Sequence, residues 1–166
     1  MQIKVKKLNP NAKLPTQGSQ YAAGYDLYAV ETVWIEGNKT RLISTGLSIE
    51  IPEGYFGAIY ARSGLATKQG LRPANCVGII DSDYRGPVMV AIHNDSPEIE
   101  MKSISMGDNT YVNKPGINET AAKKIDAGQR IAQLVIQKFE PIEFLEVDEL
   151  DTTERGQGGF GSTGEK

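Results

Sequence analysis

The stretch 75–86, Asn-Cys-Val-Gly-Ile-Ile-Asp-Ser-Asp-Tyr-Arg-Gly, holds the densest group of side chains that can do chemistry. Residues 77–80 form a short β-branched run, which favours a buried strand. Turn-forming residues follow, and the apolar run 88–92 then predicts a β-hairpin. The tip of this hairpin would carry two carboxylates, a tyrosine and an arginine, while Gly78 leaves room for a ligand against the backbone. An ordinary acidic turn explains the same residues, so the rest of the chain must decide between the two.

Residues 62–70, Arg-Ser-Gly-Leu-Ala-Thr-Lys-Gln-Gly, indicate a phosphate site. Ser63 suits a helix N-cap, residues 65–69 can make one or two helical turns, and Gly70 can end them. An arginine at the end of a strand that runs into a helix brings a guanidinium and free amides to one place. The alternative, which is the commoner case for such a stretch alone, is a surface arginine beside an ordinary cap.

Two polar residues stand inside apolar strands. Asp26 lies among small and aromatic residues in 23–29, where capping a turn is its default role. Gln133 lies in the long apolar run 131–139 and needs a partner, which is either another protein group or a ligand.

The C-terminal stretch 155–166 is rich in glycine and contains one phenylalanine. Ordering about ten such residues costs on the order of 10 kcal/mol in backbone entropy, so we expect a flexible arm. The spacing of its glycines matches two nucleotide-binding patterns. Both matches are false, because neither a βαβ unit nor the P-loop lysine accompanies the glycines. Arg155, Phe160, Ser162 and Thr163 suit an arm that closes over a ligand with a flat ring at one end and phosphates at the other. A disordered solubilising tail is the alternative.

The composition bounds the class of protein. The 166 residues suffice for one domain with a substantial core. A net charge of −3 does not favour bulk attraction to nucleic acid or to an anionic membrane. The single cysteine, Cys76, rules out an intrachain disulfide and suits a reducing compartment, so we expect a cytoplasmic location, or a nuclear one in a eukaryote. The first residues contain no apolar run long enough for a signal peptide or a membrane span.

The pattern of strands predicts an all-β sandwich or barrel, because 18 glycines and 8 prolines separate many short β-branched runs. The segment Asp95–Ala127 lacks strong periodicity, and we expect a surface excursion there with a brief helix over 118–124. Besides the hairpin, strands are expected at residues 3–8, 23–29, 32–35, 40–44, 47–51, 56–61, 131–139 and 142–147.

Together these stretches resemble the trimeric dUTP diphosphatase (dUTPase) family over nearly the whole chain. The third and fifth motifs are highly specific, whereas the first two would be weak alone. The resemblance implies a β jelly roll with one short helix over residues 1–154 and a flexible arm over 155–166. The five matching stretches are, in the order of the family's motifs, 23–29, 61–66, 75–86, 128–136 and 155–164.

The activity that the resemblance implies is the Mg²⁺-dependent hydrolysis of dUTP to dUMP and pyrophosphate, with water attacking the α-phosphorus. This reaction limits uracil incorporation into DNA and supplies dUMP for thymidylate synthesis. The resemblance also implies a homotrimer in which each active site is shared between subunits.

The resemblance gives each candidate residue a role. Asp81 resembles the carboxylate that activates the attacking water, and Asp26 the acid that holds the water shell of the metal. Tyr84 resembles the aromatic residue beneath deoxyribose that leaves no space for a 2′-hydroxyl. The other implied substrate contacts are Asn75 and Gly78 for uracil, Arg62, Ser63, Gly64 and Gln133 for phosphates, and Arg155, Phe160, Gly161, Ser162 and Thr163 in the closing arm.

The metal follows from the chemistry of the residues as well. The five matching stretches have no clustered carboxylates to enclose a bare ion, so the Mg²⁺ that the resemblance implies would be carried by phosphate oxygens and waters. The single histidine, His93, lies in an apolar strand, where packing is the expected role.

One departure from the family is the length of Asp95–Ala127, which replaces a short connection. We expect this insertion to leave the chemistry untouched and to offer a surface to a protein partner. A regulatory binding protein that uses the pocket as a ligand switch is therefore one rival interpretation, and a pull-down with and without the insertion tests it. A dCTP deaminase is the other rival, which release of ammonia instead of pyrophosphate would reveal.

Overall fold

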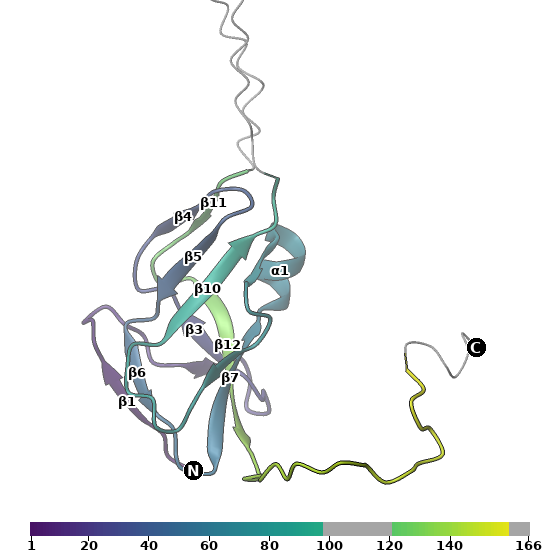
Figure 1. Cartoon of the computed structure of the whole chain (residues 1–166). Coiled ribbons are helices and arrows are strands. Elements are labelled where there is room, and N and C mark those ends of the chain that lie inside the picture. The colour runs from purple at the N-terminus through teal and green to yellow at the C-terminus, as the bar shows by residue number, and fades with distance from the viewer. Residues whose placement is uncertain (98–120, 160–166) are drawn as a thin grey trace, which may run out of the picture.

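The computed structural model describes residues 1–97 and 121–159. These residues form short strands and one helix around a single apolar core (Figure 1). In chain order the elements are β1 (Lys4–Lys7), β2 (Thr16–Gln17), β3 (Tyr25–Tyr28), β4 (Val33–Ile35), β5 (Thr40–Ser44), β6 (Leu47–Glu50), β7 (Tyr55–Ala61), α1 (Ser63–Gln69), β8 (Leu71–Pro73), β9 (Gly78–Ile80), β10 (Met89–Asn94), β11 (Lys123–Ile125) and β12 (Arg130–Lys138). No helix in these ranges is long and apolar enough to span a membrane.

The strands pair in antiparallel fashion and, within the described ranges, make four small sheets. The largest sheet has the order β2-β3-β12-β7-β9, and the others are β5-β10-β8, β1-β6 and β11-β4. The chain crosses repeatedly from one sheet to another, and the fold is the β jelly roll with one short helix that the sequence predicts.

The pair β7 and β12 forms the centre of the largest sheet and carries the candidate site at its edges. Seven registered positions join the two strands, from Ala132 opposite Ala61 to Lys138 opposite Tyr55. Position 57 within this pair requires glycine, because a β-carbon there would stand 2.8 Å from a methyl group of Ile51. A side chain at this position would therefore push the core apart.

The helix α1 lies where it was expected, but its capping differs. The N-cap is Arg62, with extended backbone angles and no side-chain cap, whereas Ser63 is already the first helical residue. The Ser63 carbonyl accepts a hydrogen bond from the Thr67 hydroxyl at 2.7 Å, and the predicted capping role of Ser63 is wrong. Gly70 ends the helix as predicted, with a φ of 63° that favours glycine.

The predicted hairpin over 75–92 is wrong. β9 pairs with β7 in the largest sheet, whereas β10 pairs with β5 and β8 in another. The eight residues from 81 to 88 therefore connect two sheets. Turn-forming residues indicate only that the chain reverses, and the partners of each strand are decided by tertiary packing.

Two further expectations fail near the C-terminus. Residues 142–147 form no strand, and their side chains are all exposed. In the predicted helix 118–124, residues 118–120 lie outside the described ranges, and Lys123–Lys124 belong to β11, which pairs with β4. Ile125 is fully buried, so the last residues of the predicted insertion are part of the folded body. The division into a domain over 1–154 and an arm over 155–166 stays a prediction.

Candidate active site

A cluster of charged side chains lies where β3, β7 and β12 meet. The Asp26 side chain is only 5% exposed. Its Oδ1 accepts a hydrogen bond from Arg62 Nε at 2.8 Å, and its Oδ2 accepts one from Arg130 Nη1 at 3.2 Å. Two guanidinium groups share one carboxylate, so the cluster keeps one formal positive charge in excess. A carboxylate with this little exposure requires such pairing.

Sequence reasoning found Asp26 and Arg62 but missed Arg130. A signal was present, because Arg130 stands directly after the turn residues Gly128 and Gln129 and before an apolar strand. That position gave no indication of the side to which the arginine points. The metal role expected of Asp26 stays a prediction, whereas the structure shows that its carboxylate pairs with both arginines.

Gln133 lies on the same stretch of sheet, directly opposite Asp26 on β3 and Tyr60 on β7. Its amide forms no hydrogen bond to any described residue, so it is free to bind a ligand. Gly24 creates the space for this side chain, since a β-carbon at Gly24 would lie 3.3 Å from Gln133 Cβ. The nearby start of α1 is open as well, because Ser63 and Gly64 are exposed and a β-carbon at Gly64 would meet nothing within 4 Å.

The second group of predicted residues surrounds β9. Cys76 has a positive φ of 59°, which bends the chain sharply between Asn75 and Val77. The bend brings the Asn75 amide nitrogen over Gly78, 3.3 Å from where a β-carbon would stand. A larger residue than glycine at this position would displace the side chain that is predicted to read uracil.

Tyr84 is held flat against the turn. A β-carbon at Gly86 would overlap the Tyr84 ring, and the Tyr84 hydroxyl donates to the Pro87 carbonyl at 3.1 Å. The Tyr84 amide also donates to the Asp81 carbonyl at 3.2 Å. The Asp81 carboxylate itself is exposed and contacts no cation among the described residues, so it is accessible to water.

Asp81 and Arg62 lie at opposite ends of β7. Ile80 is opposite Gly57, and Asp81 continues toward the Tyr55 end of the strand, whereas Arg62 follows its other end. At about 3.3 Å per residue, the five steps along the strand from Gly57 to Arg62 span about 17 Å. An extended arginine side chain covers less than half of this distance. The two groups therefore cannot contact one phosphate within a single chain.

The third group is the C-terminal arm. Arg155 is exposed, and its Nε donates to the Gly158 carbonyl at 2.9 Å. Phe160, Gly161, Ser162 and Thr163 lie outside the described residues. The predicted closure of the arm over a ligand stays a prediction.

The described residues contain no group of three or more His, Cys, Asp or Glu side chains that could hold a metal ion. Asp26 offers one carboxylate, and both of its oxygens already accept hydrogen bonds from arginine. This donor set fits Mg²⁺ that is carried by substrate phosphates and waters, with Asp26 able to hold a water of the shell, and does not fit a directly bound ion.

The profile of the dUTPase family matches residues 10–105 and 116–164, which include every candidate site residue. The chain belongs to the dUTPase family. The deoxyuridine 5′-triphosphate nucleotidohydrolase of Yarrowia lipolytica is 42% identical over 166 residues, which cover 99% of this chain and 90% of that protein. The enzyme of the same description from Nautilia profundicola is 43% identical over 164 residues, which cover 99% of this chain and 99% of that protein.

Solved dUTPase structures have the same fold. The dUTPase of Staphylococcus bacteriophage 80alpha with dUpNHpp superposes with a TM-score of 0.80 at 31% identity and covers 98% of each chain. The dUTPase of phage phi11 of S. aureus, in which a structural Mg(II) ion is coordinated, has a TM-score of 0.73 at 28% identity over 90% of this chain and 98% of its own. The family resemblance, the enzyme class and the fold that the sequence implies are confirmed, whereas the roles of individual residues stay predictions.

Proposed function

We propose that this member of the dUTPase family hydrolyses dUTP to dUMP and pyrophosphate by attack of water on the α-phosphorus. The observation that carries the proposal is the family match, which covers all three groups of candidate residues. The chemistry of these groups supports it, because a cationic cluster, an accessible carboxylate and an aromatic ring on a tight turn suit a triphosphate, a water and a sugar. In the cell, this activity would limit uracil in DNA and supply dUMP, in the cytoplasm or in the nucleus of a eukaryote.

In the proposed mechanism, Asp81 takes a proton from the attacking water, a contribution of typically about 10²–10⁴ in rate. Its exposure among the described residues leaves it free to do so. Tyr84 packs beneath the deoxyribose and excludes a 2′-hydroxyl, while Asn75 and the backbone at Gly78 bind the uracil. Arg155 and the residues that follow it close over the substrate and exclude water.

Arg62 and Gln133 bind the phosphates. Asp26 holds Arg62 through Nε, which leaves the two terminal nitrogens of the guanidinium to donate to phosphate oxygens. Mg²⁺, carried by the phosphates and their waters, would neutralise the charge that develops on the leaving pyrophosphate, with Asp26 beside its water shell.

We further propose that each site combines residues of different chains in a homotrimer. The separation of about 17 Å along β7 supports sharing, since Arg62 and Asp81 of one chain cannot contact the same phosphate. A second observation supports assembly. The residues of segment 140–150 are all exposed, and the segment extends away from the body (Figure 1). Isolated in water, side chains such as Phe144 at 90% and Leu145 at 84% exposure would be unfavourable.

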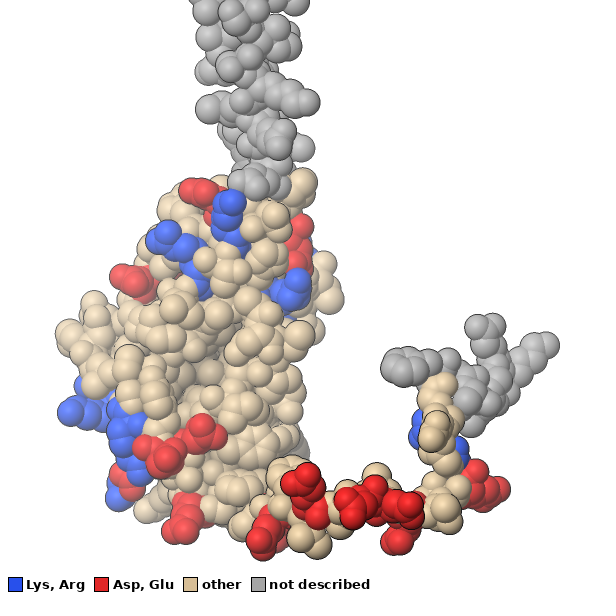
Figure 2. Space-filling model, viewed as in Figure 1, with Lys and Arg blue, Asp and Glu red and all other residues tan. Residues whose placement is uncertain are grey.

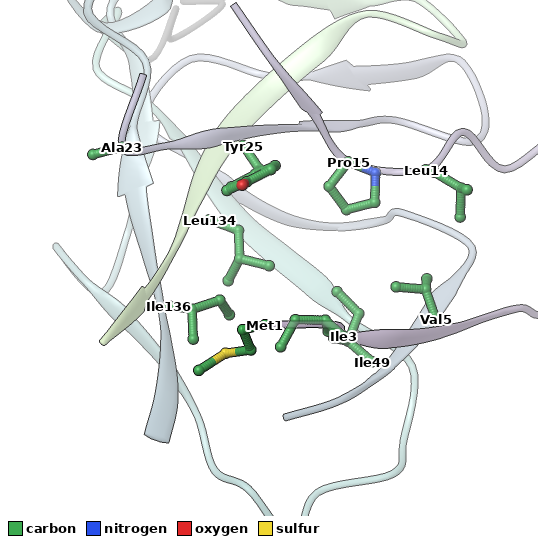
Figure 3. Close-up of a pocket in the computed structure, with 10 residues that line it drawn as sticks. All are labelled: Met1, Ile3, Val5, Leu14, Pro15, Ala23, Tyr25, Ile49, Leu134 and Ile136. Atoms are coloured by element: carbon green, nitrogen blue, oxygen red, sulfur yellow. The ribbon is translucent and has the colours of Figure 1, made fainter. Parts of the chain in front are cut away.

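A groove on the body offers a complementary surface for that segment. It has a volume of about 460 Å³ and an apolar lining that includes Ile3, Ile49 and Ile136 (Figure 3). β1 forms one wall through Val5, whereas its Lys4 and Lys6 lie on the opposite face of the strand. Residues 140–154 also contain seven acidic and no basic residues, which stand out along the extended segment in Figure 2. The match between the segment of one chain and the groove of another is therefore one of apolar side chains.

A pyrophosphate-release assay across dUTP, dTTP, dCTP and UTP tests the activity. We expect turnover of dUTP well above that of the others, and no release of ammonia from dCTP. Equal turnover of all four nucleotides would contradict the proposed base and sugar recognition, and ammonia release would show a deaminase.

Co-assembly of two inactive variants tests the sharing of sites. We expect Asp81→Asn and Arg62→Met to be nearly inactive alone and to regain activity when they are unfolded and refolded together. Each mixed oligomer then contains sites with an intact Asp81 from one chain and an intact Arg62 from another. If mixed oligomers form, as mass spectrometry can establish, and remain inactive, then both residues serve a site within one chain.

A further inference from the structure

Arg130 reaches Asp26 because of an irregularity in β12. The register of β12 against β3 shifts between Arg130 and Ala132, so that Arg130 lies opposite Tyr28 and Ile131 is the extra residue. Without this β-bulge, Ile131 would face the side of Asp26 and Arg130 would point into the core. With the bulge, Ile131 and Ala132 are both fully buried and Arg130 lies on the Asp26 side. Bulges often re-aim a side chain next to a functional site.

Arg130 is only partly used by the protein. Nη1 contacts Asp26 Oδ2, while the side chain remains 51% exposed. No other carboxylate among the described residues pairs with it. Two arginines that converge on one carboxylate repel each other, and an anion placed between their free nitrogens would relieve this repulsion.

The surroundings add positive charge. Lys13 places its ammonium 5.3 Å from the centre of the Tyr28 ring, and Tyr28 is the residue opposite Arg130. The amide of Gln133, also without a described partner, lies two residues beyond the bulge on the same face. Cations and a free amide donor therefore face one region, where Asp26 is nearly buried and has both oxygens occupied.

We propose that Arg130 is a second phosphate-binding arginine of this site, paired with Arg62 through Asp26 and aimed by the bulge in β12. The inference rests on the proposed hydrolysis of dUTP and extends its phosphate-binding set. Arg130 donates through Nη2, the terminal nitrogen that Asp26 leaves free, to phosphate oxygens, so its contribution grows with the number of phosphates. Asp26 holds the two guanidinium groups side by side, one on each of its oxygens.

The test compares the affinities of dUpNHpp, dUMP and inorganic tripolyphosphate for the full-length assembled protein, by calorimetry at fixed Mg²⁺. The variants are Arg130→Gln, Arg130→Lys and, as a matched control, Arg41→Gln. Arg41 is an exposed arginine on β5 in another sheet, with no acidic partner among the described residues. Thermal unfolding of each variant shows whether the fold persists, and Asp26 remains paired with Arg62 in every one.

We expect Arg130→Gln to weaken the binding of dUpNHpp and of tripolyphosphate about ten- to a hundredfold, which corresponds to the loss of one hydrogen bond to a charged group. Binding of dUMP should change less than about fivefold, and Arg130→Lys should recover part of the loss because it keeps the charge without the fork. The control should bind all three ligands as the wild type does.

Two outcomes would overturn the inference. An equal loss of affinity for dUMP and dUpNHpp would mean that Arg130 only shapes the pocket. If Arg130→Gln binds all three ligands as the wild type does, Arg130 does not contact phosphate. Wild-type turnover of dUTP is measured in parallel. If the wild type fails to hydrolyse dUTP, the proposed function is wrong, while tripolyphosphate binding still decides whether Arg130 contacts phosphate.

Discussion

The substitution Asp26→Asn tests the charged cluster most directly. Asparagine keeps the shape of the side chain but replaces one carboxylate oxygen with an amide nitrogen, which cannot accept a hydrogen bond from a guanidinium. Arg62 or Arg130 then loses its acceptor, and the pair of arginines loses its counter-charge. The Arg62 side chain, which is 24% exposed, has little water to replace the lost bond, whereas Arg130 has more.

The magnitude follows from these exposures. A hydrogen bond to a charged group is worth about 1.5–3 kcal/mol, which applies to the mostly buried contact with Arg62. The half-exposed contact with Arg130 adds up to about 1 kcal/mol. We therefore expect a loss of about 1.5–4 kcal/mol in stability. For a chain of this size, each kcal/mol lowers Tm by about 2–4 °C, so the expected decrease in Tm is about 3–16 °C.

The assay is thermal unfolding followed by near-UV circular dichroism. Subunit concentration is held constant, because assembly makes Tm depend on it. The matched control is Asp126→Asn, which removes the exposed contact with Lys124 at 2.6 Å and should cost less than about 1 kcal/mol. Tripolyphosphate should raise the Tm of Asp26→Asn, since an added anion replaces the missing charge. If Asp26→Asn is no less stable than Asp126→Asn, the cluster does not persist in solution and the reasoning fails.

Three further substitutions test individual contacts. Asp81→Asn should lower kcat of dUTP hydrolysis by about 10²–10⁴ and leave dUpNHpp affinity nearly unchanged, and more than a tenth of wild-type kcat would exclude Asp81 as the base. Gly86→Ala should displace Tyr84, because its β-carbon would overlap the ring. The ratio of kcat/KM between dUTP and UTP should then narrow, and an unchanged ratio would place the exclusion of ribose elsewhere. Gly24→Ala should press on Gln133 and raise KM for dUTP, whereas unaltered kinetics would show that Gln133 can move aside at no cost.

Much of the fold could be predicted from the sequence because the strands are short and bounded by glycine and proline. The apolar runs at 40–44, 47–51 and 56–61 agree with β5, β6 and β7 to within one residue at either end. Sequence reasoning also indicated that Gln133 needs a partner, because it is a polar residue inside an apolar strand. For Asp26 the residues alone favoured the cap of a turn, and the family resemblance placed it in the candidate site, where the fold pairs its buried carboxylate with two arginines.

Other features could not be predicted, because they depend on partners far away in the sequence. Residues 77–80 and 88–92 read as a hairpin by their spacing, yet β9 finds its partner in β7 and β10 finds its partners in β5 and β8. Arg130 was missed for the same reason. The shift in register that aims it is a property of the pairing with β3, and local sequence does not determine such a bulge.

The segment 142–147 shows that a wrong prediction about secondary structure can still point to a surface that needs to be covered. Its apolar residues were read as a strand because such residues need burial, and in the single chain they remain exposed. A sequence pattern specifies that a surface is to be covered, but it does not specify which chain covers it. The separation of Arg62 from Asp81 along β7 is a second observation of this kind, since the two groups of one chain cannot contact the same phosphate. The proposed homotrimer would satisfy both requirements together, because a neighbouring chain would cover the exposed segment and supply the other half of the site.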